Sequence, residues 1–258
     1  MKKSLSNKVA LVTGGTKGIG RAIADKLSRE GINVIITARS EPQDNDLNHY
    51  FIKADHSKAD VGQILLKEIE EKFGKIDIIV NNAGANLTPG GGFNFINDED
   101  WENEIQLNLM SAVRVNKALI PLMLKQKKGT IVNISMNPAI QPIWEMTMAY
   151  SASKAALNSY SKSLASELGP SGIRVNTVSP GLVKTPQMQS YVDSISKDSG
   201  VLPEEIIKNI LDKLGNVPLG RPAEPSEIAD LVRFLCSDES TYITGSIYQI
   251  DGGSLAVV

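Results

Sequence analysis

The sequence predicts an α/β fold: a doubly wound parallel sheet of about seven strands with helices on both faces, in three layers. Short apolar runs alternate along the chain with amphipathic helical segments, which is typical of β-α-β units. The runs are rich in β-branched residues and apolar almost throughout, as expected for strands buried on both faces. The length of 258 residues fits one domain spanning 1–258.

The N-terminal half supplies four strands and their connections. Apolar runs predict strands at 8–13, 33–37, 49–53 and 76–80, and helices are expected at 21–30 and 61–73. Only about fifteen residues separate the second strand from Asp55, so we expect the connecting helix there to be truncated or absent.

The C-terminal half supplies three further strands. They are expected at 130–135, 173–178 and 246–250. A long helix is predicted over 98–125, with a kink at Pro121. Other helices are expected at 150–168, after Pro203 and over 222–235.

A glycine-rich turn, 14–20, follows the first strand and opens the first helix. This order is the context that a dinucleotide-binding fingerprint requires. Glycines let the backbone approach a pyrophosphate, and the helix N-terminus offers N–H groups to its charge. A tight turn without a ligand has the same composition, so this motif alone leaves both interpretations open.

The end of the second strand bears on the choice of dinucleotide. Folds that bind NAD place an acidic residue there, but this strand ends Thr37-Ala38-Arg39, with no carboxylate before Glu41. Arg39 can clamp a 2′-phosphate, and Lys17 adds a second positive charge. NADP(H) is therefore favoured over NAD(H); the alternative is that both are solvated surface cations.

Asp55 follows the third strand and is placed to accept a hydrogen bond from an adenine amino group. Its neighbour His56 is expected at the surface.

Tyr150 and Lys154 are four residues apart, which puts them one turn apart on the same face of a helix. A free tyrosine titrates near about 10, and a neighbouring cation lowers that pKa by favouring the phenolate. Tyr150 is therefore a candidate acid/base. The same spacing arises by chance in many helices, so this hypothesis depends on the other motifs.

Taken in order, five features resemble the signature of the short-chain dehydrogenase/reductase family over essentially the whole chain. They are TGGTKGIG, NNAG at 81–84, Asn108, YSASK at 150–154 and Pro180-Gly181. The resemblance implies a Rossmann-type fold. It also implies hydride transfer between a nicotinamide cofactor and a carbonyl or alcohol.

The resemblance further implies residue roles. Tyr150 is the expected acid/base, Lys154 lowers its pKa, and Asn108 holds a proton-relay water through its helix backbone. The cofactor-binding residues implied are Gly14, Thr16, Lys17, Gly18, Ile19, Gly20, Arg39, Asp55, Asn82, Ala83, Gly84, Tyr150, Lys154, Pro180, Gly181, Val183 and Thr185. By position, 186–219 resembles the family's substrate lid, and helix pairing between subunits implies a homotetramer or homodimer.

The serine departs from the family pattern. The family usually has it thirteen residues before the tyrosine, whereas Ser135 precedes Tyr150 by fifteen. Counted from Gly129, the usual position falls on Met136, and a slip of one residue turns a side chain to the other face of a strand. Ser135 is the candidate catalytic serine. The rival is a structural Ser135, with the oxyanion partner missing or supplied elsewhere.

Substrate contacts are assigned by position alone, to Asn86, Trp144, Met146 and Met188. These mainly apolar residues favour a small, largely neutral carbonyl or alcohol substrate. Two alternatives stay open: a 3-oxoacyl thioester reductase acting on an acyl carrier protein, and a nucleotide-binding regulatory protein with weak catalysis, which the displaced serine motivates.

Composition argues against several other classes. A net charge of −2 provides no bulk field to recruit nucleic acid or a membrane surface. A single cysteine, Cys236, cannot form an internal disulfide, and two histidines without a ligand cluster predict no metal site. The first apolar run, VALV, is too short for a signal-peptide core, so a cytoplasmic protein is expected.

Overall fold

The computed structural model describes residues 5–42 and 48–256. Seven strands form one parallel sheet in the order β3-β2-β1-β4-β5-β6-β7. They are β1 (Val9–Thr13), β2 (Asn33–Ala38), β3 (Tyr50–Lys53), β4 (Ile78–Asn81), β5 (Gly129–Ile134), β6 (Ile173–Pro180) and β7 (Ile247–Ile250). In register, Leu11 of β1 lies between Ile35 of β2 and Ile79 of β4. The predicted fold class is confirmed.

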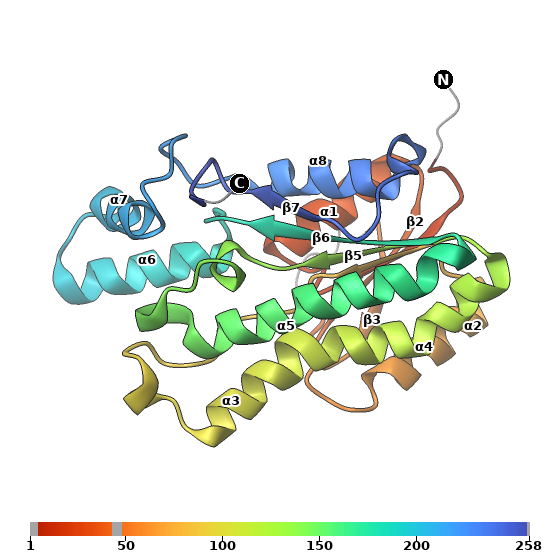
Figure 1. Ribbon diagram of the computed structural model, residues 1–258, viewed down its shortest axis with the longest axis horizontal. Helices are drawn as coiled ribbons and strands as arrows, with labels where there is room; N and C mark the ends of the chain where they lie inside the picture. Colours follow the sequence, from red (N-terminus) through yellow and green to blue (C-terminus); the bar gives the residue numbers. More distant parts are fainter. Residues whose placement is uncertain (1–4, 43–47, 257–258) are drawn as a thin grey trace.

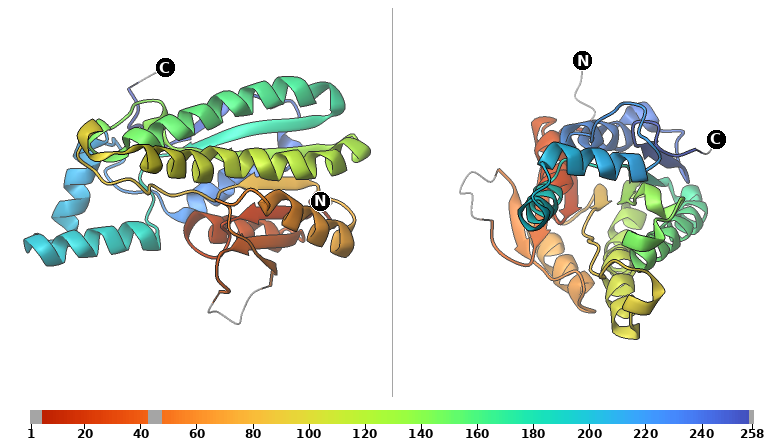
Figure 2. Two further views of the ribbon diagram at one scale, coloured as in Figure 1. Left: turned by 90° about the horizontal axis from the view of Figure 1, so that it is seen from below. Right: turned by 90° about the vertical axis from the view of Figure 1, so that its left-hand side faces the viewer.

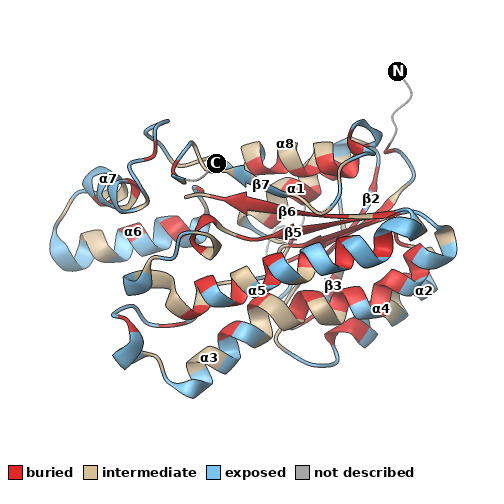
Figure 3. Ribbon diagram, in the orientation of Figure 1, coloured by how far each residue is buried: buried red, intermediate tan, exposed pale blue. Residues whose placement is uncertain are grey.

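Helices cover both faces of the sheet (Figures 1 and 2). One face carries α2 (Val61–Phe73), α4 (Ser111–Gln126) and α5 (Trp144–Leu168); the other carries α1 (Gly18–Arg29) and α8 (Pro225–Cys236). Alternate residues of one strand enter the two cores: Leu11 faces α2, α4 and α5, whereas Val12 faces α1 and α8. The inner strands β1, β4 and β5 are buried along their whole length, because helices pack on both of their faces (Figure 3).

Sheet order fixes the position of the site. The chain builds outward from β1 to β3, then returns to the other side of β1 with β4. In open α/β sheets, ligands bind at such a reversal, outside the carboxyl ends of the strands. The glycine turn leaves β1 and the NNAG segment ends β4, so both flank this crevice.

The long helix predicted over 98–125 is interrupted. α3 (Asp98–Ile105) passes through a π-helical turn (Gln106–Met110) before α4 begins. Pro121 lies inside α4, so the irregularity falls at the π-helical turn rather than at the proline. Such turns occur frequently at functional sites, and this one contains Asn108.

Two other helices differ from expectation. α5 begins at Trp144 rather than Tyr150, with a non-helical Thr147 (φ −138°) in its first turns. α6 (Pro186–Ser199) precedes α7 (Pro203–Lys213), and both project beyond the sheet (Figure 1). The sequence predicted only α7, because α6 is largely polar and buries only two residues, Met188 and Val192.

Between β2 and β3, residues 39–42 and 48–49 form no helix, and the rest of that prediction lies on 43–47, outside the described residues. Within the described ranges, no helix is long and apolar enough to cross a membrane.

Candidate active site

The glycine turn is shaped by backbone conformation and by lack of space. Gly14 and Gly18 have φ of 65° and 57°, in the left-handed region that other residues rarely adopt. A Cβ on Gly20 would collide with the Gly14 carbonyl oxygen and with the side chain of Asn82. Bare backbone therefore faces the crevice at the start of α1, as binding of a pyrophosphate requires.

Thr13, the last residue of β1, ties this turn to the NNAG segment. Its hydroxyl accepts hydrogen bonds from the backbone N–H groups of Asn82 and Ala83, both at 2.9 Å. The Asn82 side chain donates to the carbonyl oxygens of Thr13 (2.9 Å) and Gly14 (3.2 Å). The two predicted cofactor-binding segments thus form one hydrogen-bonded unit.

Charged residues lie at the outer end of this unit. Lys17 and Arg39 are exposed, and Thr16 and Ile19 are partly buried. Asp55 Oδ1 accepts hydrogen bonds from the backbone N–H (3.0 Å) and hydroxyl (2.8 Å) of Ser57. Burial acts to raise the pKa of Asp55, but these bonds and the charges of Lys58 and Arg39 lower it overall.

His56 is buried rather than exposed, so the surface prediction is wrong. Its Nε2 lies 2.6 Å from Thr37 Oγ1, and the same hydroxyl accepts the Gly14 N–H at 3.3 Å. A hydroxyl that accepts from Gly14 can donate to Nε2, which fits a neutral imidazole. Burial lowers the pKa of His56 to about 4. The histidine therefore supports the glycine turn from beneath.

The run from Pro180 to Thr185 closes the crevice on its other side. The Gly181 N–H donates to Ile250 O (3.1 Å), and Val183 forms a β-bridge with Ala223. Thr185 caps α6 by accepting the Met188 N–H at 3.2 Å. A Cβ on Gly18 would lie 3.4 Å from Thr185 Cγ2, so the base of α6 abuts the glycine turn.

Tyr150 and Lys154 come together on α5 as predicted. Lys154 Nζ lies 5.9 Å from the centre of the Tyr150 ring and donates a hydrogen bond to Ile134 O at 2.9 Å. Lys154 is buried, whereas Tyr150 keeps some exposure. A Cβ on Gly84 would lie 3.0 Å from Lys154 Nζ, so the NNAG segment meets this pair directly.

The electrostatics of the pair differ from the prediction. Burial raises the pKa of Tyr150, and the charge of Glu104 raises it further. The expected lowering of the Tyr150 pKa by Lys154 is not found in the protein without a bound nucleotide. Burial lowers the pKa of Lys154 to about 8, and Glu104 opposes that change. At neutral pH, Tyr150 therefore holds its proton beside a mostly charged Lys154.

Asn108 lies one helical turn after Glu104, at the back of the site. Its Oδ1 accepts the Ala85 N–H (3.1 Å), and its Nδ2 donates to Ala85 O (2.9 Å) and Glu104 Oε2 (2.6 Å). A Cβ on Gly84 would lie 2.6 Å from Asn108 Oδ1. Glu104 was not predicted from the sequence. Its spacing could have indicated it, because an acidic residue four positions before Asn108 lies on the same helix face.

Ser135 follows β5 directly, and its N–H still pairs with Val178 O at 2.8 Å. Strand alternation places it on the same face as Asn133, whose side chain donates to Ser161 of α5. Its hydroxyl is buried and has no hydrogen-bond partner in the described structure. Met136, at the family's usual serine position, is partly buried and carries no hydroxyl to donate.

Three of the four residues expected to contact substrate, Asn86, Trp144 and Met146, lie where the loop after β4 meets the start of α5. Asn86 Nδ2 donates to Met146 O at 2.9 Å, which links the loop after β4 to the start of α5. The Trp144 side chain nearby is exposed. Met188 is buried and packs with Val192 of α6 and Ile206 of α7, and its contact with substrate stays a prediction.

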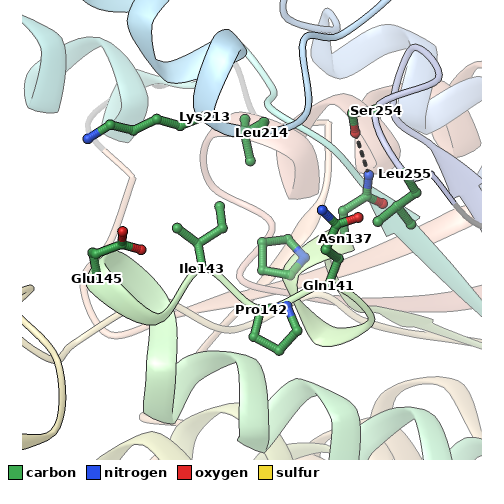
Figure 4. Close-up of a pocket in the computed structure, with 10 residues that line it drawn as sticks. Asn137, Gln141, Pro142, Ile143, Glu145, Lys213, Leu214, Ser254 and Leu255 are labelled. Atoms are coloured by element: carbon green, nitrogen blue, oxygen red, sulfur yellow. Dashed lines mark hydrogen bonds between the residues drawn. The ribbon is translucent and has the colours of Figure 1, made fainter.

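A cavity of about 170 Å³ opens between the segment before α5, the end of α7 and the C-terminal loop (Figure 4). Its lining residues are Asn137, Pro138, Gln141, Pro142, Ile143, Glu145, Lys213, Leu214, Ser254 and Leu255. Asn137 Nδ2 donates to Ser254 Oγ at 2.9 Å and so fixes one wall. Neither Tyr150 nor the glycine turn is among the residues that line this cavity.

Comparisons with known proteins define the class of enzyme. A family model described as enoyl-(acyl carrier protein) reductase matches residues 14–254. The chain is 37% identical to the 3-oxoacyl-[acyl-carrier-protein] reductase FabG of Haemophilus influenzae, covering 96% of this chain and 98% of that protein. It is 38% identical to the oxidoreductase UcpA of Salmonella typhimurium, covering 97% and 95%.

Among solved structures, L-sorbose reductase from Gluconobacter frateurii, complexed with NADPH and L-sorbose, superposes with a TM-score of 0.91. The two chains are 32% identical and each is covered in full. Fold, site and relatives together define an NAD(P)-dependent oxidoreductase that acts on carbonyl or alcohol groups. The chain belongs to the short-chain dehydrogenase/reductase family.

Proposed function

We propose that this enzyme transfers hydride between NADP(H) and the carbonyl or alcohol group of a small, largely neutral molecule, with Tyr150 as acid/base. The observation that carries the proposal is that Lys154 and Asn108 meet at Gly84, with the Tyr150 ring centre 5.9 Å from Lys154 Nζ. There the catalytic helix α5 reaches the backbone that would hold the nucleotide. The bound nicotinamide would supply or accept the hydride.

Tyr150, Lys154 and Ser135 would have separate roles in the proton transfer. In reduction, the Tyr150 hydroxyl gives its proton to the substrate oxygen; in oxidation it takes that proton back. The raised pKa of Tyr150 keeps it protonated at neutral pH, which is the form needed for reduction. The Lys154 ammonium, 5.9 Å from the ring centre, would stabilise the phenolate that remains. The unpartnered Ser135 hydroxyl would donate a hydrogen bond to the same substrate oxygen.

The backbone around the crevice fits a dinucleotide. Glycines at 14, 18 and 20 leave room along the start of α1, and the 180–185 run faces them. NADP(H) is favoured because Lys17 and Arg39 are exposed cations and no acidic residue ends β2. Two structurally similar enzymes, L-sorbose reductase and the actinorhodin polyketide ketoreductase, were solved with NADPH.

The test is a panel of small ketones, ketoses and aldehydes, followed by loss of NADPH or NADH absorbance. We expect NADPH-dependent reduction of at least one neutral carbonyl, with NADH markedly poorer. Preference for NADH would refute the assigned nucleotide, and activity confined to charged substrates would refute the assigned substrate class.

A second candidate is reduction of a 3-oxoacyl thioester on a carrier protein, which the similarity to FabG favours. An acidic carrier needs a basic surface near the pocket, and Lys184 there already lies 3.9 Å from Glu224. Comparing a 3-oxoacyl carrier-protein substrate with its free ketone analogue separates the two. A large preference for the carrier-bound substrate would favour the second candidate.

We also propose that α6 and α7 act as a substrate lid and that the enzyme is a homotetramer or homodimer. A stripe of small exposed residues along α5 would allow close helix pairing between subunits: Ala152, Ala156, Ser159, Ser163 and Ser166. Light scattering tests the assembly, and a monomer at micromolar concentration would contradict it.

A further inference from the structure

Glu104 is a completely buried carboxylate that the reaction as described does not use. Oε1 accepts the backbone N–H groups of Leu87 (2.6 Å) and Thr88 (3.0 Å). Oε2 accepts the Nδ2–H of Asn108 (2.6 Å). All three partners donate hydrogen bonds, and this arrangement stabilises an ionised carboxylate rather than a carboxylic acid.

Its charge acts on the reacting pair. Burial raises the pKa of Glu104 overall, although its hydrogen bonds with Leu87 and Thr88 and the charge of Lys154 act to lower it. The negative charge of Glu104 in turn adds to the raised pKa of Tyr150 and opposes the lowering of the Lys154 pKa by burial. The buried ammonium of Lys154 otherwise has a single neutral acceptor, Ile134 O. An unpaired buried charge is costly. Glu104 reaches Lys154 through Asn108 rather than by a direct ion pair: Asn108 Nδ2 donates to Glu104 Oε2, and Asn108 Oδ1 and Lys154 Nζ both lie against Gly84. The carboxylate is therefore placed to act as a counter-charge to the buried ammonium.

We propose that Glu104 is a positioning residue that keeps Lys154 in its ammonium form beside Tyr150 and fixes Asn108 and the loop at 87–88. The proposal rests on the proposed function only in taking Tyr150 and Lys154 as the reacting pair. The effect of the Glu104 charge on the protonation of Lys154 can be measured in the protein without substrate or nucleotide.

Replacing the carboxylate by an amide isolates the charge. Glu104→Gln keeps the size of the side chain and an oxygen that can accept the Leu87 and Thr88 N–H groups. It removes one negative charge, so Lys154 should lose its proton at lower pH. A nearby unit charge in a partly screened interior shifts a pKa by on the order of one unit.

The experiment is an NMR titration of nucleotide-free enzyme carrying lysine labelled with ¹³C at Cε, whose chemical shift follows amine protonation. Lys154→Met identifies the Lys154 signal. The wild-type signal should titrate near pH 8, and the Glu104→Gln signal about one pH unit lower. Glu102→Gln is the matched control, because Glu102 lies on the same helix but is exposed; it should leave the midpoint unchanged.

Activity provides a second readout. The kcat deficit of Glu104→Gln should narrow as the pH is lowered from about 8 to about 6, because Lys154 regains its proton. Glu104→Met, also neutral, serves as a second variant if the amide fails to fold.

An unchanged Lys154 midpoint in both neutral variants would overturn the proposal and leave Glu104 a structural residue. Retained turnover in Tyr150→Phe would instead refute the proposed function, and the titration would be unaffected. The two failures are therefore distinguishable.

Discussion

The two sides of the crevice are built differently. On the nucleotide side, glycines and backbone groups form the surface, and Thr13 and Asn82 lock them together. On the catalytic side, Tyr150, Lys154 and Asn108 act through side chains, and their ionisation depends on burial and on Glu104. The backbone surface on the nucleotide side tolerates few changes of shape, whereas the catalytic side depends on single protons.

The largest effect should therefore fall on the catalytic side. Tyr150→Phe removes the hydroxyl that exchanges a proton with substrate, so kcat should drop by on the order of 10³–10⁴-fold. The measurement is steady-state turnover with the best substrate of the panel. Turnover within tenfold of wild type would mean that another group supplies the proton.

The next effect tests the displaced serine. If the unpartnered Ser135 hydroxyl binds the substrate oxygen, Ser135→Ala should lower kcat by roughly 10²–10³-fold. Met136→Ala is the matched control at the neighbouring position and should have a much smaller effect on kcat. Equal kcat for wild type and Ser135→Ala would establish Ser135 as structural.

A third prediction concerns stability on the nucleotide side. His56 is buried with a pKa lowered from 6.5 to about 4, so the unfolded chain binds a proton there that the folded chain does not. Folding stability should therefore fall as the pH drops from about 6.5 to 4, by up to about 3 kcal/mol from this residue. Urea unfolding of His56→Gln should show a correspondingly smaller loss. An identical pH dependence in both proteins would contradict this assignment.

The smallest effect should be on nucleotide choice. Arg39→Asp replaces an exposed cation with an anion, so affinity for NADPH should fall by about tenfold or more, with little loss for NADH. Titration of each nucleotide into both proteins measures this. Equal losses for the two nucleotides would exclude a 2′-phosphate contact at Arg39.

The sequence predicted the nucleotide side better than the catalytic side, for a physical reason. Strand runs and glycine spacing are local, so the strands, the glycine turn and the NNAG segment follow from nearby residues. The burial of His56, the capping of α6 by Thr185 and the role of Glu104 depend on the folded surroundings of each side chain. The packing of Met188 between α6 and α7 was likewise not predictable, because a methionine suits either a pocket or a core.

The difference between the predicted and the observed direction of the Tyr150 pKa shift also arises from the folded surroundings. Spacing alone put Lys154 beside Tyr150, but the net shift in pKa depends on how far each group is buried and on a third charge. A spacing of four residues gives no information about the burial of the two groups or about the third charge.

The division of labour between the two sides is tested most directly by the Kd of NADPH for the Tyr150→Phe variant, measured by calorimetry beside wild type. The two Kd values should lie within about threefold of each other. A phenyl ring preserves the shape of α5, and the glycine turn holds the nucleotide without the Tyr150 hydroxyl. A loss of affinity as large as the loss of turnover would contradict this expectation.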